Sequence, residues 1–162
     1  MAQPRQPLSP EAAFARAAAR CATTEYCASD WRRKLAAAGL TPQEANGVVE
    51  RLKKEGFIDE ARYARAFAHD KAAYDRWGRL KIRQGLALKG ISESLIDEAL
   101  DAVDDGVWRQ NLEHLLNQKA RTLKGADDYV RRQKLMRFAA GRGYEAELIF
   151  DIIDHFSGAV EP

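Results

Sequence analysis

Apolar residues recur along the chain with the spacing of amphipathic helices, and the whole pattern occurs three times. In each segment a basic helix is predicted to end at a glycine, an apolar residue follows, and a second helix begins. The turn glycines are Gly39, Gly90 and Gly143. The apolar positions are Trp31, Leu35, Leu40, Ala45, Val48, Val49 and Leu52 in the first segment; Ile82, Leu86, Ile91, Leu95, Ile96, Ala99, Leu100 and Val103 in the second; and Leu135, Ala139, Tyr144, Leu148, Ile149, Ile152, Ile153 and Phe156 in the third.

Residue numbers give the register of these segments. Gly90 lies 51 residues after Gly39 (90 − 39), and Gly143 lies 53 residues after Gly90 (143 − 90). The same two shifts carry most other apolar positions of one segment onto those of the next. A single amphipathic pattern would not match itself so often by chance, which indicates a true internal repeat.

Capping residues mark the ends of the predicted helices. Glycine enters the left-handed conformation after a helix C-terminus without a Cβ penalty. Thr41 with Pro42 and Glu44 forms a capping box, and Ser92 is the equivalent N-cap. Glu145 takes this place in the third segment and is a weaker start. These residues place the second helix of each repeat directly after its glycine turn.

We therefore predict an all-α protein, an elongated array of three tandem three-helix repeats preceded by a short N-terminal helix. The predicted parts are a flexible tail at 1–9, the N-terminal helix at 10–24, repeats at 25–75, 76–125 and 126–158, and a tail at 159–162. The last repeat is expected to be truncated to two helices. Small units that contact mainly their neighbours favour a solenoid-like row, but repetition does not fix the angle between units, and a compact bundle stays open.

Composition narrows the class of protein. The chain has 162 residues, 46% hydrophobic and 31% charged, with a net charge of only +2, so total charge does not indicate a nucleic-acid-binding protein. No apolar run approaches the ~20 residues of a membrane span. Cys21 and Cys27 fit neither a four-ligand zinc site nor a disulfide-rich secreted protein. We expect a monomer in a reducing, cytoplasmic compartment, without membrane association.

The charges are segregated by helix. Residues 76–91 carry five bases and no acid, residues 93–105 carry six acids and no base, and residues 119–137 carry seven bases against two acids. Solubility explains any single run. A basic helix at the same place in three successive units, however, would form a basic stripe suited to a long polyanion or an acidic protein groove. The candidate contact residues are Arg32, Arg33, Lys34, Arg76, Arg79, Lys81, Arg83, Arg131, Arg132, Lys134 and Arg137.

No catalytic or ligand-binding pattern is evident. The three histidines stand in different repeats, and none is close in sequence to a cysteine or to another histidine. Asp97, Asp101 and Asp104 share a helix face but lack the calcium-loop spacing, so an acidic solvent face explains them. Nucleotide-binding glycine motifs are absent. We predict no catalytic residues, no cofactor, no metal and no enzyme activity.

The aromatic residues are assigned to packing. Tyr63, Phe67 and Tyr74 form a stripe along one predicted helix, which is typical of a core face. Trp31 and Trp77 adjoin basic residues and could stack on bases, but their matching places at the start of a repeat favour a structural role.

One stretch carries a specific motif. The run from Leu52 to Phe67, LKKEGFIDEARYARAF, resembles the signature of the RecX family: a glycine, two apolar residues, an acidic pair and, one residue later, a basic-aromatic-alanine triplet. The run from Arg76 to Leu86 resembles the opening of that family's second repeat, and the run from Arg32 to Leu35 the opening of its first. The similarity extends over roughly residues 12–156.

The resemblance implies a regulator that binds, not an enzyme. Such a protein would lie in the groove of the filament that the recombinase RecA forms on single-stranded DNA, bridge neighbouring protomers and modulate assembly, ATP hydrolysis and strand exchange, with inhibition as the expected direction. The chain departs from the family at Cys27, where a serine N-cap is usual, at the mid-helix Gly85, which costs about 1 kcal/mol against alanine, and at Ala139, where a larger residue is usual.

Two other functions stay open. A general single-stranded or duplex DNA-binding protein would use each helix, turn and helix as a DNA-binding module, but the second helices of the last two repeats are acidic. A scaffold that binds a non-DNA protein through apolar faces would show no salt-sensitive affinity for a nucleoprotein filament. Direct DNA contact by a filament regulator is left open as well.

Overall fold

The computed structural model of the protein describes residues 6–156, which form nine α-helices and no β-strand. This confirms the predicted all-α class. The helices are α1 (Pro10–Cys21), α2 (Ala28–Ala37), α3 (Pro42–Lys54), α4 (Glu60–Ala73), α5 (Arg79–Leu88), α6 (Glu93–Asp101), α7 (Asp105–Arg121), α8 (Asp128–Gly141) and α9 (Ala146–Phe156). None of these helices, over the residues described, has both the length and the apolar composition of a membrane span. The predicted tail residues 1–5 and 159–162 lie outside the described part.

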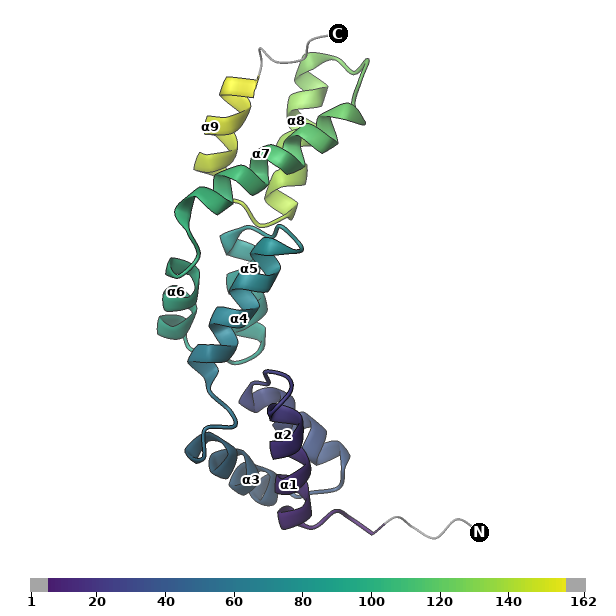
Figure 1. The fold of residues 1–162 in the computed structure, drawn as a ribbon. Helices are drawn as coiled ribbons and strands as arrows, with labels where there is room; N and C mark the ends of the chain where they lie inside the picture. The colour runs from purple at the N-terminus through teal and green to yellow at the C-terminus, as the bar shows by residue number, and fades with distance from the viewer. Residues whose placement is uncertain (1–5, 157–162) are drawn as a thin grey trace, which may run out of the picture.

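The helices follow one another as a row of three units, from α1–α3 at one end of the molecule to α7–α9 at the other (Figure 1). A first hydrophobic core lies among α1–α3, a second mainly among α4–α6, and a third among α7–α9. The elongated array is therefore confirmed. One compact bundle, the alternative left open by the sequence, is not the observed arrangement.

The packed units begin one helix earlier than the predicted repeats at 25–75, 76–125 and 126–158. α4, expected to close the first repeat, packs against α5 and α6, and α7 packs against α8 and α9. α1 packs on α3, so it completes the first unit, and the third unit has three helices instead of a truncated pair. A sequence repeat fixes the distance between equivalent residues, but it does not show at which helix each structural unit begins. The pattern therefore located the repeats and misplaced their boundaries.

The glycine turns lie where the pattern predicts them. Gly39, Gly90 and Gly143 have φ angles of 95°, 78° and 91°, in the left-handed region that glycine enters without a Cβ clash, and the apolar residue after each is buried. The Thr41 hydroxyl accepts a hydrogen bond from the Glu44 N–H at 3.2 Å, and the Glu44 carboxylate accepts one from the Thr41 N–H at 3.0 Å. The predicted capping box is confirmed.

A close contact explains the mid-helix glycine of α5. A Cβ on Gly85 would lie 3.0 Å from Cζ of Phe67, which α4 contributes. An alanine side chain at this position would require the Phe67 ring to shift. Glycine costs about 1 kcal/mol in helix propensity, but it allows α5 to pack closely on α4.

Successive units are joined in the same way at both joints. The N-terminal end of a middle helix lies against the glycine turn of the following unit. At the first joint the Ser29 hydroxyl, on α2, donates to the Lys89 carbonyl at 2.7 Å. At the second joint the Gly78 N–H donates to the Arg142 carbonyl at 2.8 Å, and the next hydrogen bond runs from the Leu80 N–H to the Gly143 carbonyl at 2.9 Å.

The second joint is an extensive backbone contact. A Cβ on Gly78 would lie 2.3 Å from the Gly143 carbonyl oxygen, so the two chain segments touch directly. Burial raises the pKa of Tyr144 to about 12, and its protonated hydroxyl donates to the Arg76 carbonyl at 2.7 Å. α7 also spans two cores, since Trp108 is buried in the second and later residues of the helix in the third. Units two and three therefore form one body.

Side chains hold the first joint. Among the described residues of the first unit, Cys27 is the one buried in the second core. It is also the N-cap of α2, and burial raises the pKa of its thiol, which is therefore uncharged at neutral pH. Beside it Lys89 pairs with Asp30 at 2.8 Å. A second ion pair, between Arg62 and Glu25 at 2.5 Å, ties α4 to the loop before α2.

Replacing Asp30 with asparagine is expected to lower the free energy of unfolding by about 1–3 kcal/mol at pH 7. Burial by itself would raise the pKa of Asp30, but hydrogen bonds from Lys89 and Cys27 outweigh it and hold that pKa below its ordinary value. The unfolded chain therefore binds this proton more tightly. The ion pair stabilises the fold above about pH 4, and its contribution is lost as the pH falls through the lower folded-state pKa.

Urea unfolding at pH 7 and pH 3 measures this effect. The difference in free energy of unfolding between D30N and the unchanged chain should be smaller at pH 3 than at pH 7. The control is D101N, which changes an exposed acid with no ion pair to another described residue and should stay within about 0.5 kcal/mol of the unchanged chain. An equal loss for D30N at both pH values would contradict the role of the ion pair.

Candidate basic interaction surface

The predicted contact residues lie on the middle helix of each unit or just before it. α2 carries Arg32, Arg33 and Lys34; α5 and the loop before it carry Arg76, Arg79, Lys81 and Arg83; and α8 carries Arg131, Arg132, Lys134 and Arg137. None of them is buried. Because α2, α5 and α8 belong to successive units, the predicted residues are distributed along the length of the array (Figure 1).

Five of these arginines are already paired with acids. The pairs are Arg32 with Glu50 at 4.0 Å, Arg33 with Asp30 at 3.5 Å, Arg79 with Asp105 at 3.1 Å and Glu145 at 3.4 Å, Arg83 with Asp97 at 2.5 Å, and Arg132 with Asp154 at 2.6 Å. In every unit one of these pairs joins the middle helix to the last helix, so the segregation of charge by helix serves packing within the unit. The five arginine side chains remain 33–72% exposed, and such a pair contributes only about 0–1 kcal/mol.

The other six predicted residues form no ion pair with another described residue. They are Lys34, Arg76, Lys81, Arg131, Lys134 and Arg137. Lys34 lies 5.7 Å from the centroid of the Tyr26 ring, and Lys81 lies 4.6 Å from that of Trp77. Cation–π contacts at exposed sites contribute about 0.5–1 kcal/mol. We call these six residues the unpaired cations, and they are the stronger candidates for contact with a partner.

A group of cations gathers at the second joint. Lys71 and Lys81 both contact the Trp77 ring, with Nζ atoms 4.5 and 4.6 Å from the ring centroid. Arg142 donates to a backbone carbonyl of the loop before α5 at 2.8 Å, and Arg76 stands in that loop with a φ of 52°. Sequence reasoning missed Lys71 and Arg142, since Arg142 and the residue that it contacts are 67 positions apart in the chain.

Of the aromatic residues that the sequence assigned to packing, all but Tyr74 are buried or partly buried. Trp31 is buried in the first core and Tyr63 in the second, while Trp77 is partly buried against the second core. The prediction that Tyr74 belongs to the same core stripe is wrong, because its side chain is 77% exposed. α4 ends at Ala73, so Tyr74 is the C-cap residue and leaves the buried face of the helix.

Two of the three aspartates that the sequence placed on one helix face have structural partners. Asp97 on α6 pairs with Arg83, and Asp104 caps α7 by accepting from the Gly106 N–H at 2.8 Å. Among residues 6–156, no group of three or more histidine, cysteine, aspartate or glutamate side chains could hold a metal ion. The acidic α6 and α9 would be repelled from phosphates, which argues against either as a helix for the DNA major groove.

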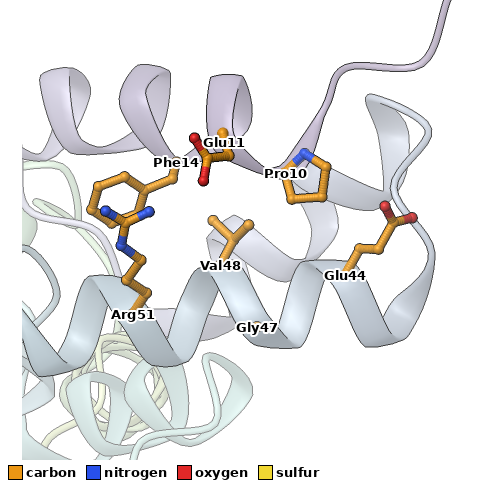
Figure 2. A pocket seen from close by; sticks show the side chains of 7 residues that line it. All are labelled: Pro10, Glu11, Phe14, Glu44, Gly47, Val48 and Arg51. Carbon is orange, nitrogen blue, oxygen red and sulfur yellow. The ribbon is translucent and has the colours of Figure 1, made fainter.

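A shallow depression of about 260 Å³ lies between α1 and α3 (Figure 2). It is lined by Pro10, Glu11, Phe14, Glu44, Gly47, Val48 and Arg51. The Arg51 guanidinium lies over the Phe14 ring, 3.8 Å from its centroid, and also pairs with Glu55 at 3.2 Å. None of the predicted contact residues lines this depression, so it is separate from the basic surface.

Two models of one protein family match the chain. The model described as "RecX, second three-helix domain" matches residues 59–100, and the model described as "RecX, third three-helix domain" matches residues 109–153. These ranges correspond to α4–α6 and α7–α9. The family domains therefore follow the packed units and not the repeat boundaries predicted from the sequence.

Relatives and solved structures agree with the family models. Regulatory protein RecX of Xanthomonas axonopodis pv. citri (strain 306) is 33% identical over 135 residues, which cover 80% of this chain and 82% of that protein. Regulatory protein RecX of Chlorobium phaeobacteroides (strain BS1) is 34% identical over 126 residues, 76% of each chain. The crystal structure of RecX from Lactobacillus salivarius, at 15% identity, has a TM-score of 0.81 over 92% of this chain and 97% of that one, which shows a common fold. The chain therefore belongs to the RecX family of regulatory proteins.

Proposed function

We propose that this protein binds the filament that RecA forms on single-stranded DNA, lies along the groove of that filament, and inhibits its assembly, ATP hydrolysis and strand exchange. It acts by binding and not by catalysis, in recombination, DNA repair and the SOS response, in the bacterial cytoplasm. One observation carries the proposal. An elongated array presents unpaired cations on or beside the middle helix of each of three successive units.

A repeating arrangement of cations suits a repeating partner. Lys81 and Lys134 are related by the shift of 53 residues between the second and third turn glycines (134 − 81), so equivalent positions of two units carry the same charge. A filament groove offers phosphates and acidic side chains at regular intervals, and an elongated array can contact more than one protomer. A ligand that bridges protomers favours one relative position of them, which would hinder the changes that accompany ATP hydrolysis.

The rival functions predict different binding. A general DNA-binding protein would bind naked DNA as tightly as the filament, yet acidic helices stand beside the basic ones in the second and third units. A scaffold for another protein would show no salt-sensitive affinity for the filament. The unpaired cations favour a partner that is both anionic and periodic.

Adding the protein to preformed RecA filaments on single-stranded DNA is expected to lower steady-state ATP hydrolysis, and the effect should saturate as the groove fills. A coupled ATPase assay measures this, with binding followed in parallel by sedimentation. Demonstrated binding with unchanged or increased hydrolysis would contradict inhibition and leave only the binding part of the proposal.

A further inference from the structure

One pair of facing positions differs between the third unit and the other two. Arg32 on α2 donates to Asn46 on α3 at 3.0 Å. Adding 51 to both numbers gives Arg83 on α5 and Asp97 on α6, which form an ion pair at 2.5 Å. The first two units therefore join their middle and last helices with a polar pair at this level.

The third unit has an apolar pair instead. Adding 53 to Arg83 and Asp97 gives Met136 on α8 and Phe150 on α9. The buried neighbours support this equivalence, because the positions just before the pair are buried isoleucine or leucine in both units. These neighbours are Ile82 and Ile96 in the second unit and Leu135 and Ile149 in the third.

A neighbouring ion pair supports the placement of Met136 opposite Phe150. Arg132 on α8 pairs with Asp154 on α9 at 2.6 Å. Arg132 precedes Met136 by four residues, and Asp154 follows Phe150 by four. Residues four apart share a helix face, and α8 and α9 run in opposite directions around a tight turn, so the next level along the two helices holds Met136 and Phe150.

The apolar pair is accessible and has an unpaired cation next to it in the chain. Phe150 is 43% exposed, whereas Met136 is partly buried against the third core. Arg137, an exposed unpaired cation, follows Met136 directly on α8. The first two units show that the fold accepts a polar pair at this level, so the exposed phenylalanine is not a requirement of the helix packing.

Acids on α9 favour a protein over a nucleic acid as the group that covers Phe150. Glu147 lies one turn before Phe150, and Asp151 and Asp154 follow it. Arg109 and Arg132 neutralise the last two, which leaves Glu147 to repel phosphate. A protein surface with one apolar side chain and acidic residues facing α8 complements both the apolar pair and the adjacent Arg137.

We propose that Met136 and Phe150 form an apolar anchor for a protomer of the recombinase filament, and that Arg137 faces acidic residues at the edge of the same contact. The proposal rests on the proposed function and assigns the third unit to the protein component of the filament. The first two units, which have a polar pair at this level, then contribute charge without such an anchor.

The test converts the apolar pair into its counterpart from the second unit. The double variant M136R/F150D installs the Arg83–Asp97 pair and leaves the net charge unchanged. It is expected to keep its helical circular dichroism and to bind preformed RecA filaments about tenfold or more weakly. The loss should persist at high salt, since an apolar contact is not screened. The single variant F150S, which leaves α8 intact, should show a loss as well.

The control is L88S, because Leu88 on α5 is 83% exposed and so more accessible than Phe150, and this variant should bind like the unchanged chain. Unchanged filament binding by M136R/F150D and F150S would overturn the anchor and leave the proposed function standing. An equal loss on naked single-stranded DNA would overturn it by showing a nucleic-acid contact. Failure of the unchanged chain to bind filaments would overturn the proposed function, and the anchor with it.

Discussion

Reversing the charges of Lys34, Lys81 and Lys134 together is expected to weaken binding to the RecA filament about 100-fold. Each lysine is an unpaired cation on the middle helix of a different unit, so the three changes act along the whole array. Losing one ion pair at an exposed site costs up to about 1 kcal/mol. The triple change therefore costs up to about 3 kcal/mol, and about 1.4 kcal/mol corresponds to a factor of ten in affinity. Sedimentation with filaments measures the affinity of K34E/K81E/K134E, and circular dichroism checks its helicity.

A matched control separates position from total charge. K54E/R65E/K124E also reverses three exposed cations that form no ion pair with another described residue, and it changes the net charge by the same amount. It should bind within about threefold of the unchanged chain. Equal losses for the two triple variants would mean that only net charge matters, which contradicts a specific surface on α2, α5 and α8.

Replacing Gly143 with alanine is expected to lower the free energy of unfolding by about 3 kcal/mol or more. A side chain at its φ of 91° costs about 1–2 kcal/mol. The added Cβ would also lie 2.3 Å from the Lys81 Cβ and 2.6 Å from the Lys81 nitrogen, and overpacking costs about 1–3 kcal/mol more. The clash would separate the two backbone segments of the second joint, including the Leu80 to Gly143 hydrogen bond.

Gly90 provides the control for backbone conformation. It occupies the same turn of the second unit with a φ of 78°, but an added Cβ would meet no heavy atom within 4 Å. G90A should therefore cost only the conformational penalty of about 1–2 kcal/mol. Urea unfolding followed by circular dichroism compares the variants, and equal losses would contradict the close contact at the second joint.

Local signals in the sequence predicted the helices and turns. Thr41 and Glu44 cap α3 through adjacent backbone groups, and the turn glycines adopt left-handed φ angles, so both depend on residues close together in the chain. The unit boundaries could not be predicted in the same way. The periodic pattern allows α4 and α7 either to end one unit or to begin the next. Contacts between helices decide between these two arrangements.

The candidate surface was only partly predictable. The sequence identified all the cations of α2, α5 and α8, but it could not show that Arg83 and Arg132 are paired while Lys81 and Lys134 are not, since that depends on side chains across a helix pair. Arg142 was missed as well. One signal could have found it, because Lys89 also stands directly before a turn glycine and also contacts a preceding unit.

Binding to the filament in preference to naked DNA is the central claim, and co-sedimentation tests it most directly. The protein would be mixed with preformed RecA filaments, with naked single-stranded DNA and with duplex DNA, each at low and at physiological salt. Preferential sedimentation with filaments at both salt concentrations, weaker at the higher one, is the predicted result. Equal binding to naked DNA, or no binding to filaments, would contradict it.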